Sequence, residues 1–511
     1  MAKLHFDQSY VDATINPLLW GSFTEHLGRC VYGGLYQPDH ETADADGLRR
    51  DVVDEVRNLD ISLVRYPGGN FVSNYDWKDG IGPRESRPTR LDFAWATVEP
   101  NLFGIDDFMK WAEAANVEPM IAVNLGTGTI KEAAEFVEYC NHPGGTYWSD
   151  LRRKNGREEP YGIKYWCLGN EMEGSWQAGH MSAEDYAAKA LEAAKMMRWV
   201  DPTIKLVACG SSYHALPEYL EWDRIVLASL YPHVDYISTH FYAAQGKGPG
   251  KQSDQDFVAS WKSLEEHIGN ASAAVQFARA KQETDRTLPI CLDEWNVWNF
   301  RDVKIDDVSD LLGKTTLELT SSEPWETAPA ILQEDYTLLD ALTFSGLGIS
   351  LINSADVVEI ACLAQLVNAI APLTTKDDGG VLRRSTWYPL YELTKKGRGE
   401  VVRAVVEAEE IETLHGRVPA LHSAVVKHHE DSCFYVFVLN AHLTDASELD
   451  VSMADSDITV TEHRSLFGPE LRAANTFDSP DAVTMTSQPV TASTSVVLPP
   501  ASFNVLRVEA N

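Results

Sequence analysis

Two glutamates each end an apolar run of the sequence. Glu171 closes residues 163–171, IKYWCLGNE, and Glu294 closes a second run that begins at Leu288. The carboxyl ends of parallel strands are where a (β/α)8 barrel carries its catalytic groups. Two carboxylates, one protonated to help a leaving oxygen depart and one ionised, are able to cleave a glycosidic bond. A single glutamate here is more often a helix cap or an ion-pair partner, but the two matching contexts predict a catalytic pair.

Further polar side chains follow the expected ends of other strands. We expect them to project towards the same face as the two glutamates; they are Glu25, Arg65, Asn70, Asn170, His240 and Tyr242. Three of them have a purely structural alternative: a buried ion pair for Arg65, a core histidine for His240, an aromatic plug for Tyr242. A sugar ring needs several directional donors and acceptors together with an aromatic wall. The convergence of these side chains at a barrel mouth therefore predicts a carbohydrate pocket.

Strand-like and helix-period segments alternate along most of the chain, which is typical of an α/β protein. Amphipathic stretches, such as 48–59 and 105–115, fill most of the gaps between the expected strands. The eight expected strands are residues 15–23, 61–66, 119–124, 163–169, 205–210, 234–240, 289–295 and 348–353. Eight such units predict a (β/α)8 TIM barrel over residues 15–397.

The last part of the chain has a different texture. From about residue 398, short runs rich in Val, Thr and Ser alternate with polar turns, which predicts a C-terminal β-sandwich over residues 398–511. Residues 1–14 include a short apolar run at 4–6, and we expect this segment to add a strand to the sandwich. Because no low-complexity linker separates the two parts, we expect a rigid interface between them.

Composition excludes several classes of protein. With 76 acidic and 43 basic side chains, the formal charge of −33 argues against nucleic acid as a partner and disfavours an anionic membrane surface. The seven cysteines are odd in number and show no CxxC spacing, so neither a disulfide framework nor a zinc site is indicated. The first residues lack a signal-peptide pattern, and no apolar run is long enough to span a bilayer. We therefore expect a cytoplasmic protein.

Several longer motifs carry a resemblance to a known family. They include FTEHLGRCVYGGLY at 23–36, RYPGGN at 65–70, WCLGNEM at 166–172, DEWNVW at 293–298 and AQLVNAIAP at 364–372. The chain resembles the intracellular α-L-arabinofuranosidases of glycoside hydrolase family 51 across the whole barrel and, more loosely, the β-rich tail. The resemblance implies the same two-part fold, no cofactor and no metal, and a homohexamer. It also implies release of terminal non-reducing α-L-arabinofuranosyl residues, with retention of configuration, from arabinan- or arabinoxylan-derived oligosaccharides.

The resemblance also implies a role for each site residue. Glu171 becomes the acid/base and Glu294 the nucleophile, while Arg65 and Tyr242 hold the nucleophile ionised and oriented. Asn170 resembles the residue that bonds the sugar 2-hydroxyl, a contact that strengthens in the transition state. The remaining substrate-binding positions are Glu25, Asn70 and Gln365 for the arabinose hydroxyls, Trp298 for the pocket wall, and His240, with Tyr242, in the polar network of the site.

Other functions stay open at this point. A metal-dependent hydrolase would use His240 with carboxylates, but the sequence has no HExxH or comparable spacing. A sugar-binding protein without activity would keep the aromatic and amide side chains and lose a glutamate. A glycosidase of the same fold acting on β-1,4-glucan or xylan would have an open cleft instead of a closed pocket. The segments 243–251 and 301–326 match no family motif, and because they follow barrel strands we expect them to border the leaving group.

Overall fold

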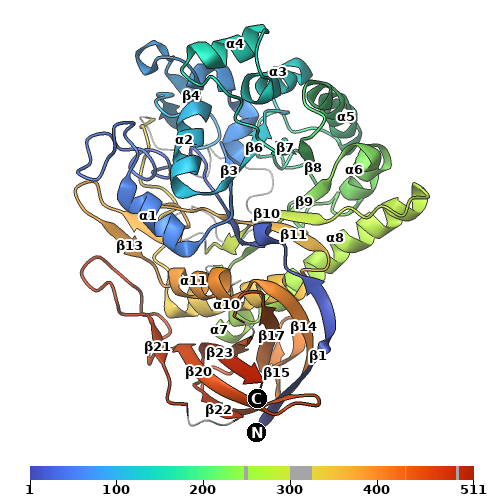
Figure 1. Cartoon of the computed structure of the whole chain (residues 1–511), viewed down its shortest axis with the longest axis vertical. Helices are drawn as coiled ribbons and strands as arrows, with labels where there is room; N and C mark the ends of the chain where they lie inside the picture. Colours follow the sequence, from blue (N-terminus) through green and yellow to red (C-terminus); the bar gives the residue numbers. More distant parts are fainter. Residues whose placement is uncertain (247–250, 300–324, 432, 491–493, 511) are drawn as a thin grey trace.

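The computed structural model describes residues 1–246, 251–299, 325–431, 433–490 and 494–510 (Figure 1). Eight parallel strands close into a barrel in the order β10–β11–β2–β3–β6–β7–β8–β9. Their bounds are β2 (Gly21–Phe23), β3 (Leu63–Tyr66), β6 (Glu118–Val123), β7 (Tyr165–Leu168), β8 (Lys205–Ala208), β9 (Tyr236–Ala243), β10 (Ile290–Val297) and β11 (Val358–Ala364). The predicted (β/α)8 barrel is confirmed.

Helices surround the barrel in chain order. Their packing follows from amphipathic sequence: in α1, for example, Val52, Val56 and Leu59 are buried on one face. The helices are α1 (Arg50–Leu59), α2 (Ile105–Ala115), α3 (Ile130–Asn141), α4 (Tyr147–Lys154), α5 (Ala183–Val200), α6 (Glu221–Leu230), α7 (Asp254–Val258), α8 (Trp261–Lys281), α10 (Leu338–Asn353) and α11 (Trp387–Lys396). Short 3-10 helices are η1 (Pro17–Trp20), η2 (Asn70–Asn74), η3 (Trp77–Gly80), η4 (Arg84–Ser86) and η5 (Tyr231–His233).

Two expected strands differ from the structure. The run 348–353 is not the eighth strand, because it forms the end of α10; the eighth strand is β11. Helix α10 packs against β10 on one side and the C-terminal sheet on the other, so it is buried all round and has no polar face to reveal its period. The run 15–23 is a strand only over its last three residues. Its first part forms η1, where the Asn16 side chain accepts from the Leu18 N–H at 3.0 Å.

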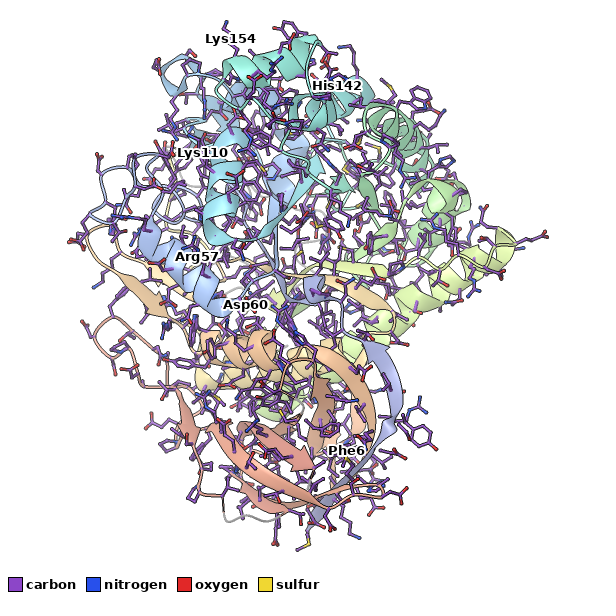
Figure 2. The ribbon with its side chains drawn as sticks, viewed as in Figure 1. Phe6, Arg57, Asp60, Lys110, His142 and Lys154 are labelled. Atoms are coloured by element: carbon purple, nitrogen blue, oxygen red, sulfur yellow. The ribbon has the colours of Figure 1, made fainter. Side chains whose placement is uncertain are left out.

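The C-terminal part contains one nine-stranded sheet, in the order β21–β20–β23–β18–β17–β14–β1–β19–β22. The Phe6 ring of β1 lies 5.1 Å from the Phe434 ring of β18, although two strands separate β1 from β18 in the sheet order (Figure 2). The sheet therefore curls around an apolar core, as a sandwich does. Its strands are β1 (Ala2–Thr14), β14 (Gly399–Glu407), β17 (Leu421–His428), β18 (Phe434–Asn440), β19 (Ser447–Met453), β20 (Ile458–Leu466), β21 (Met485–Ser487), β22 (Ser495–Leu498) and β23 (Ser502–Ala510).

The first strand of the chain belongs to this sheet. Strand β1 pairs antiparallel with β14 and parallel with β19. At the junction with the barrel, Asp60 ends α1 and its carbonyl accepts from Arg398 Nη2 at 2.8 Å, just before β14 begins (Figure 2). We propose that the two domains divide at this junction, between residues 397 and 398. Among the described helices, none combines the length and the apolar character needed to cross a membrane.

Two short hairpins follow barrel strands, and a third lies in the C-terminal part. The most important is formed by β4 (Arg90–Asp92) and β5 (Thr97–Glu99), which pair antiparallel after β3. A second pair, β12 (Leu373–Thr375) and β13 (Val381–Arg383), follows β11, and a third, β15 (Glu410–Thr413) and β16 (Gly416–Pro419), belongs to the C-terminal part. The first hairpin brings a tryptophan to the site described below.

Candidate active site

Glu294 lies in the second half of β10, and both of its carboxylate oxygens have a donor. Arg65 Nη1 donates to Oε1 at 2.8 Å, and the Tyr242 hydroxyl donates to Oε2 at 2.8 Å. All three side chains come from different barrel strands or their ends, β3, β9 and β10. Burial raises the pKa of the Glu294 carboxyl, while the positive charges of His240 and Arg65 act in the opposite direction. The two donors fix the orientation of the carboxylate.

Asp293 also reaches the site, although it precedes Glu294 directly. In a regular strand the two side chains would point to opposite faces. The pairing of β10 shifts register against both β9 and β11 at this point, which is a local irregularity of the strand. The Asp293 carboxylate lies 3.4 Å from Arg65 Nε and 3.1 Å from His240 Nε2. It is therefore a buried counter-charge for the two cations that face Glu294.

Glu171 follows β7 and faces Glu294 across the barrel mouth. Its backbone has a φ of 44°, a left-handed conformation that is uncommon for a residue with a side chain. Oε1 lies 2.8 Å from His240 Nδ1, and Oε2 accepts from Trp176 Nε1 at 2.6 Å. This carboxyl group therefore has a nitrogen partner on each oxygen.

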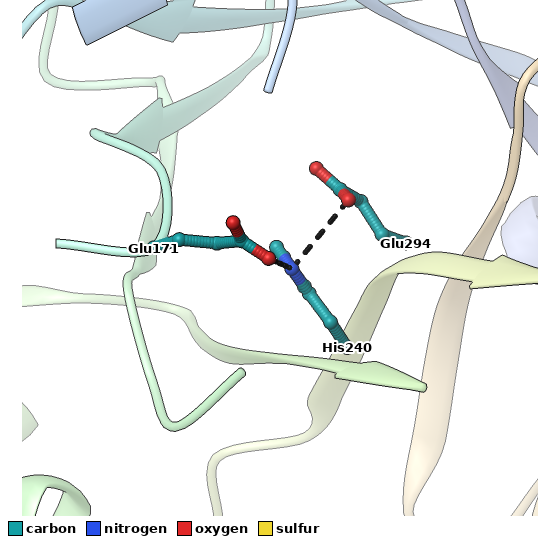
Figure 3. A group of neighbouring side chains, drawn as sticks. All are labelled: Glu171, His240 and Glu294. Carbon is teal, nitrogen blue, oxygen red and sulfur yellow. Dashed lines mark hydrogen bonds and ion pairs between the residues drawn. The ribbon is translucent and has the colours of Figure 1, made fainter. Parts of the chain in front are cut away.

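His240 lies between the two glutamates (Figure 3). Its Nδ1 is 2.8 Å from Glu171 Oε1 and 3.6 Å from Glu294 Oε2. Burial favours the neutral ring, but the charges of Glu294 and Asp293 raise the pKa of His240 well above its ordinary value. The two acids therefore favour the protonated form of the ring, which links the two carboxyl groups.

The same three side chains are a conceivable metal-binding group. One ligand atom from each of Glu171, His240 and Glu294 lies within 4.8 Å of the others. The chemistry of the surroundings does not fit a cation, because the Arg65 guanidinium is 2.8 Å from Glu294 and the raised pKa of His240 favours its protonated form. The positive charge of Arg65 would repel a metal ion at this position. The arrangement fits a pair of carboxyl groups held by fixed cations.

Two asparagines extend the network from Arg65. Its Nη2 donates to Asn170 Oδ1 at 2.7 Å, and Asn170 Nδ2 lies 3.5 Å from Asn70 Oδ1. Arg65 is fully buried, so one guanidinium orients both Asn170 and Glu294. The structure thus brings these predicted residues together.

Glu25 and Gln365 form a second cluster. Glu25 Oε1 accepts from the Phe71 N–H at 2.8 Å and from Trp95 Nε1 at 2.9 Å, and Gln365 Nε2 donates to Oε2 at 3.2 Å. Burial, with the charge of Glu294 second, raises the pKa of Glu25 to about 8. A Cβ on Gly69 would lie 2.8 Å from Glu294 Oε1 and 3.3 Å from Glu25 Oε2, so a side chain at this position would displace the Glu294 carboxylate.

Trp298 forms an aromatic wall beside this network. Its ring packs edge-to-face on Tyr242, with the ring centroids 5.5 Å apart. The half-buried indole follows the end of β10. Of the segments expected to border the leaving group, 243–251 and 301–326, residues 247–250 and 301–324 lie outside the described residues.

Three residues of the site were not predicted from the sequence: Asp293, Trp176 and Trp95. The strand alternation assigns Asp293 to the wrong face, and only the register shift of β10 corrects it. Trp176 and Trp95 lie in connecting segments, where no periodicity indicates which way a side chain points. Their indole N–H groups contact the two glutamates Glu171 and Glu25.

A (β/α)8 barrel with two facing carboxyl groups at its strand ends, surrounded by amide and aromatic side chains, defines a glycoside hydrolase. Two family models match the chain: "Alpha-L-arabinofuranosidase 1 domain" over residues 55–267 and "Alpha-L-arabinofuranosidase C-terminal domain" over residues 293–502. The chain belongs to the α-L-arabinofuranosidases of glycoside hydrolase family 51.

Individual relatives are similar to this chain over nearly its full length. An intracellular exo-α-(1→5)-L-arabinofuranosidase from Bacillus subtilis is 40% identical over 99% of both chains. An exo-α-(1→6)-L-arabinofuranosidase from Bifidobacterium longum is 39% identical and covers 99% of this chain and 97% of its own. The solved structure of a family 51 α-L-arabinofuranosidase from B. longum superposes with a TM-score of 0.92 at 37% identity, covering 99% of each chain.

Proposed function

We propose that the enzyme works by double displacement with retention of configuration, with Glu294 as nucleophile and Glu171 as acid/base. The observation that carries this proposal is the distance between the two carboxyl groups. One oxygen of each lies within 4.8 Å of the other. Retaining glycosidases place the two carboxyls about 5 to 5.5 Å apart, whereas inverting ones need about 6.5 to 9.5 Å to admit a water.

In the first step Glu171 gives its proton to the glycosidic oxygen while Glu294 attacks the anomeric carbon. The bond to the leaving sugar breaks, and an ester forms between arabinose and Glu294. Arg65 and Tyr242 aim the attacking oxygens. In the second step Glu171 takes a proton from water, which displaces Glu294 and releases arabinose. His240, which contacts Glu171, stabilises the carboxylate formed between the steps.

The surrounding residues fit a pocket for one arabinofuranosyl unit. We assign the sugar 2-hydroxyl to Asn170 and the other hydroxyls to Glu25, Asn70 and Gln365, with His240 and Tyr242 close to the reacting carbon. Trp298 forms the wall on the leaving-group side. Support comes from the contacts that tie these side chains to Arg65 and Glu294.

The substrate that we propose is a terminal non-reducing α-L-arabinofuranosyl residue of an arabinan- or arabinoxylan-derived oligosaccharide. The B. subtilis relative is named for a (1→5) linkage and one from B. longum for a (1→6) linkage, and both are named as exo-acting. We further propose a cytoplasmic location, because the B. subtilis relative is named intracellular. A homohexamer is proposed from the family resemblance, and light scattering tests it.

Initial rates on a panel of aryl glycosides test the proposed activity. The expected result is rapid hydrolysis of aryl α-L-arabinofuranoside and little turnover of β-D-xyloside or β-D-glucoside. A preference for the xyloside or the glucoside would instead support a glycosidase acting on xylan or glucan backbones. Following the configuration of the first-formed sugar by NMR then distinguishes retention from inversion.

A further inference from the structure

Asn296 lies on β10, two residues after the proposed nucleophile, and its side-chain amide bonds to backbone groups. The residue is buried, with 1% of its surface exposed. Its Nδ2 donates to the Ala364 carbonyl at 2.7 Å and to the Ile370 carbonyl at 2.6 Å, and its Oδ1 accepts from the Val297 N–H at 2.7 Å. Because two carbonyls face one end of the amide and an N–H faces the other, this orientation satisfies every partner.

The two carbonyls that Asn296 holds belong to the ends of one turn. Ala364 is the last residue of β11, and Ile370 follows it by six residues. One amide group therefore bridges the turn of residues 364–370. Within the turn, the Gln365 N–H also donates to the Ile370 carbonyl, at 3.3 Å. Asn296 thus ties the two ends of the turn to β10.

The turn depends on such contacts because its backbone is strained. Asn368 has a φ of 67° and Ile370 a φ of 36°. Asparagine is among the residues that tolerate the left-handed region, but a β-branched residue there is an outlier. Such a conformation persists only where the surrounding structure holds it. The Ile370 carbonyl accepts from Asn296 and Gln365, and its N–H donates to the Leu332 carbonyl at 2.7 Å, so both sides of the strained residue are bonded.

The turn carries Gln365, which contacts Glu25 through both ends of its amide. Gln365 Oε1 accepts from the Glu25 N–H at 3.0 Å, and Gln365 Nε2 donates to Glu25 Oε2 at 3.2 Å. A shift of the Gln365 backbone would disturb both bonds, because hydrogen bonds weaken steeply as their distance and angle depart from the optimum. The position of that backbone is set by the two carbonyls that Asn296 holds.

We propose that Asn296 is a positioning residue of the reaction. Its amide closes the turn of residues 364–370 and so places Gln365, together with Glu25, against the 3- and 5-hydroxyls of the terminal arabinofuranosyl unit. The inference rests on the proposed function, because it uses the sugar contacts proposed for Glu25 and Gln365. Since Glu294 and Asn296 belong to the same strand, the attacking carboxylate and the grip on the sugar are fixed to one rigid element.

A double-mutant cycle with Gln365 tests whether Asn296 acts through the turn. Asn296→Ala removes both donations without adding a charge, and Gln365→Ala removes the amide that the turn carries. On an aryl α-L-arabinofuranoside, each single variant should lose about 10- to 100-fold in kcat/KM, the worth of one or two hydrogen bonds. The double variant should lose at most about threefold beyond the larger single loss, because both changes remove the same contact. Any larger loss, up to the product of the two, would show independent action and overturn the proposal.

Substrates that lack one hydroxyl give a readout that a general loss of structure would not give. The unmodified enzyme should cleave aryl 3-deoxy- and 5-deoxy-arabinofuranosides less well than the parent substrate. In Asn296→Ala, at least one of these two penalties should shrink by about threefold or more, because the contact to that hydroxyl is already lost. The penalty for the 2-deoxy substrate, which reports on Asn170, should stay unchanged. Equal shrinkage of all three penalties, or of none, overturns the proposal.

The matched control is Asn475→Ala, because Asn475 makes the same kind of backbone contacts between β20 and β21. This buried residue donates through Nδ2 to the Arg383 carbonyl at 3.1 Å and to the Val483 carbonyl at 3.0 Å, and its Oδ1 accepts from the Val483 N–H at 2.7 Å. The control should lower the melting temperature, as Asn296→Ala does, and leave kcat/KM and the three penalties unchanged. A loss of kcat/KM equal to that of Asn296→Ala would make the effect a general one and overturn the proposal.

Folding and the proposed function are checked separately. Asn296→Asp is the second variant: it keeps the shape of the side chain, replaces the donor by an acceptor that faces two carbonyls, and should also lose about tenfold or more in kcat/KM. Full activity in Asn296→Asp would overturn the proposal. If neither variant folds while Asn475→Ala does, Asn296 serves the stability of the barrel alone, and the proposal is again overturned. Failure of the unmodified enzyme to cleave the aryl arabinofuranoside would instead contradict the proposed function itself.

Discussion

Arg65 and Glu294 form a buried ion pair, with Nη1 2.8 Å from Oε1 and neither side chain more than 8% exposed. A buried charge without its partner costs several kcal/mol, so each residue requires the other. Arg65 also orients Asn170, which follows a different strand. The pair therefore defines the centre of the site, and the other contacts of Glu294 are best tested with Arg65 left in place.

Replacing Tyr242 by phenylalanine removes one of the two donors to Glu294 and leaves the ring. We expect kcat/KM on an aryl arabinofuranoside to fall about 10- to 100-fold, the worth of a hydrogen bond to a charged group. The melting temperature should stay close to that of the unmodified enzyme. Tyr231→Phe, which removes a hydroxyl bonded to the Arg286 carbonyl, is the control and should keep full activity. Full activity in Tyr242→Phe would contradict the role assigned to this hydroxyl.

Glu25 links stability to pH. Its pKa is raised from 4.5 to about 8, so its contribution to stability is fully present below 4.5 and is lost as the pH rises through 8. In Glu25→Gln, the fall in the free energy of unfolding between about pH 5 and about pH 8 should shrink by about 2 to 4 kcal/mol. Urea denaturation at both pH values measures the free energy of unfolding. The control is Glu192→Gln, because Glu192 is exposed. An unchanged pH dependence would mean that Glu25 is ionised in the folded enzyme.

Asp293→Asn tests how the charge of His240 is maintained. Removing the Asp293 charge lowers the pKa of His240, so the protonated ring is lost at a lower pH. We expect the alkaline limb of the kcat/KM profile to move to lower pH, measured on an aryl substrate. Asp223→Asn, a buried aspartate that accepts from the Ser211 N–H, provides the comparison. An unmoved limb would assign that ionisation to another group.

Much of the barrel could be predicted because each strand end carries a local signal. An apolar run followed by a polar residue is visible in sequence, and six of the eight expected strands overlap their structural counterparts closely, from β3 to β10. The eighth strand could not be found in this way. Helix α10 is as apolar as a buried strand, and its burial depends on the C-terminal sheet that covers it. Only the tertiary structure distinguishes a buried helix from a buried strand in such a run.

The residues of the site also divide into those that the sequence predicts and those that it does not. Glu171 follows β7, and Glu294 and Arg65 lie in the second halves of their strands, so the barrel geometry alone brings them together. Asp293 reaches the site through a register shift, and Trp95 through a hairpin that follows β3 by more than twenty residues. Neither feature has a periodic signal in the sequence. Both depend on contacts between distant segments.

Chemical rescue with azide tests the central claim, that Glu294 is the nucleophile and Glu171 the acid/base. In Glu171→Ala the nucleophile remains, so an activated aryl arabinofuranoside still forms the covalent intermediate, and azide needs no base to attack it. In Glu294→Ala azide takes the place of the missing carboxylate and displaces the leaving group directly.

The measurement is the anomeric configuration of the arabinosyl azide from each variant, determined by NMR. The mechanism predicts the α-azide, with net retention, from Glu171→Ala and the β-azide from Glu294→Ala. The opposite pair of products would reverse the two assignments and contradict the proposed mechanism.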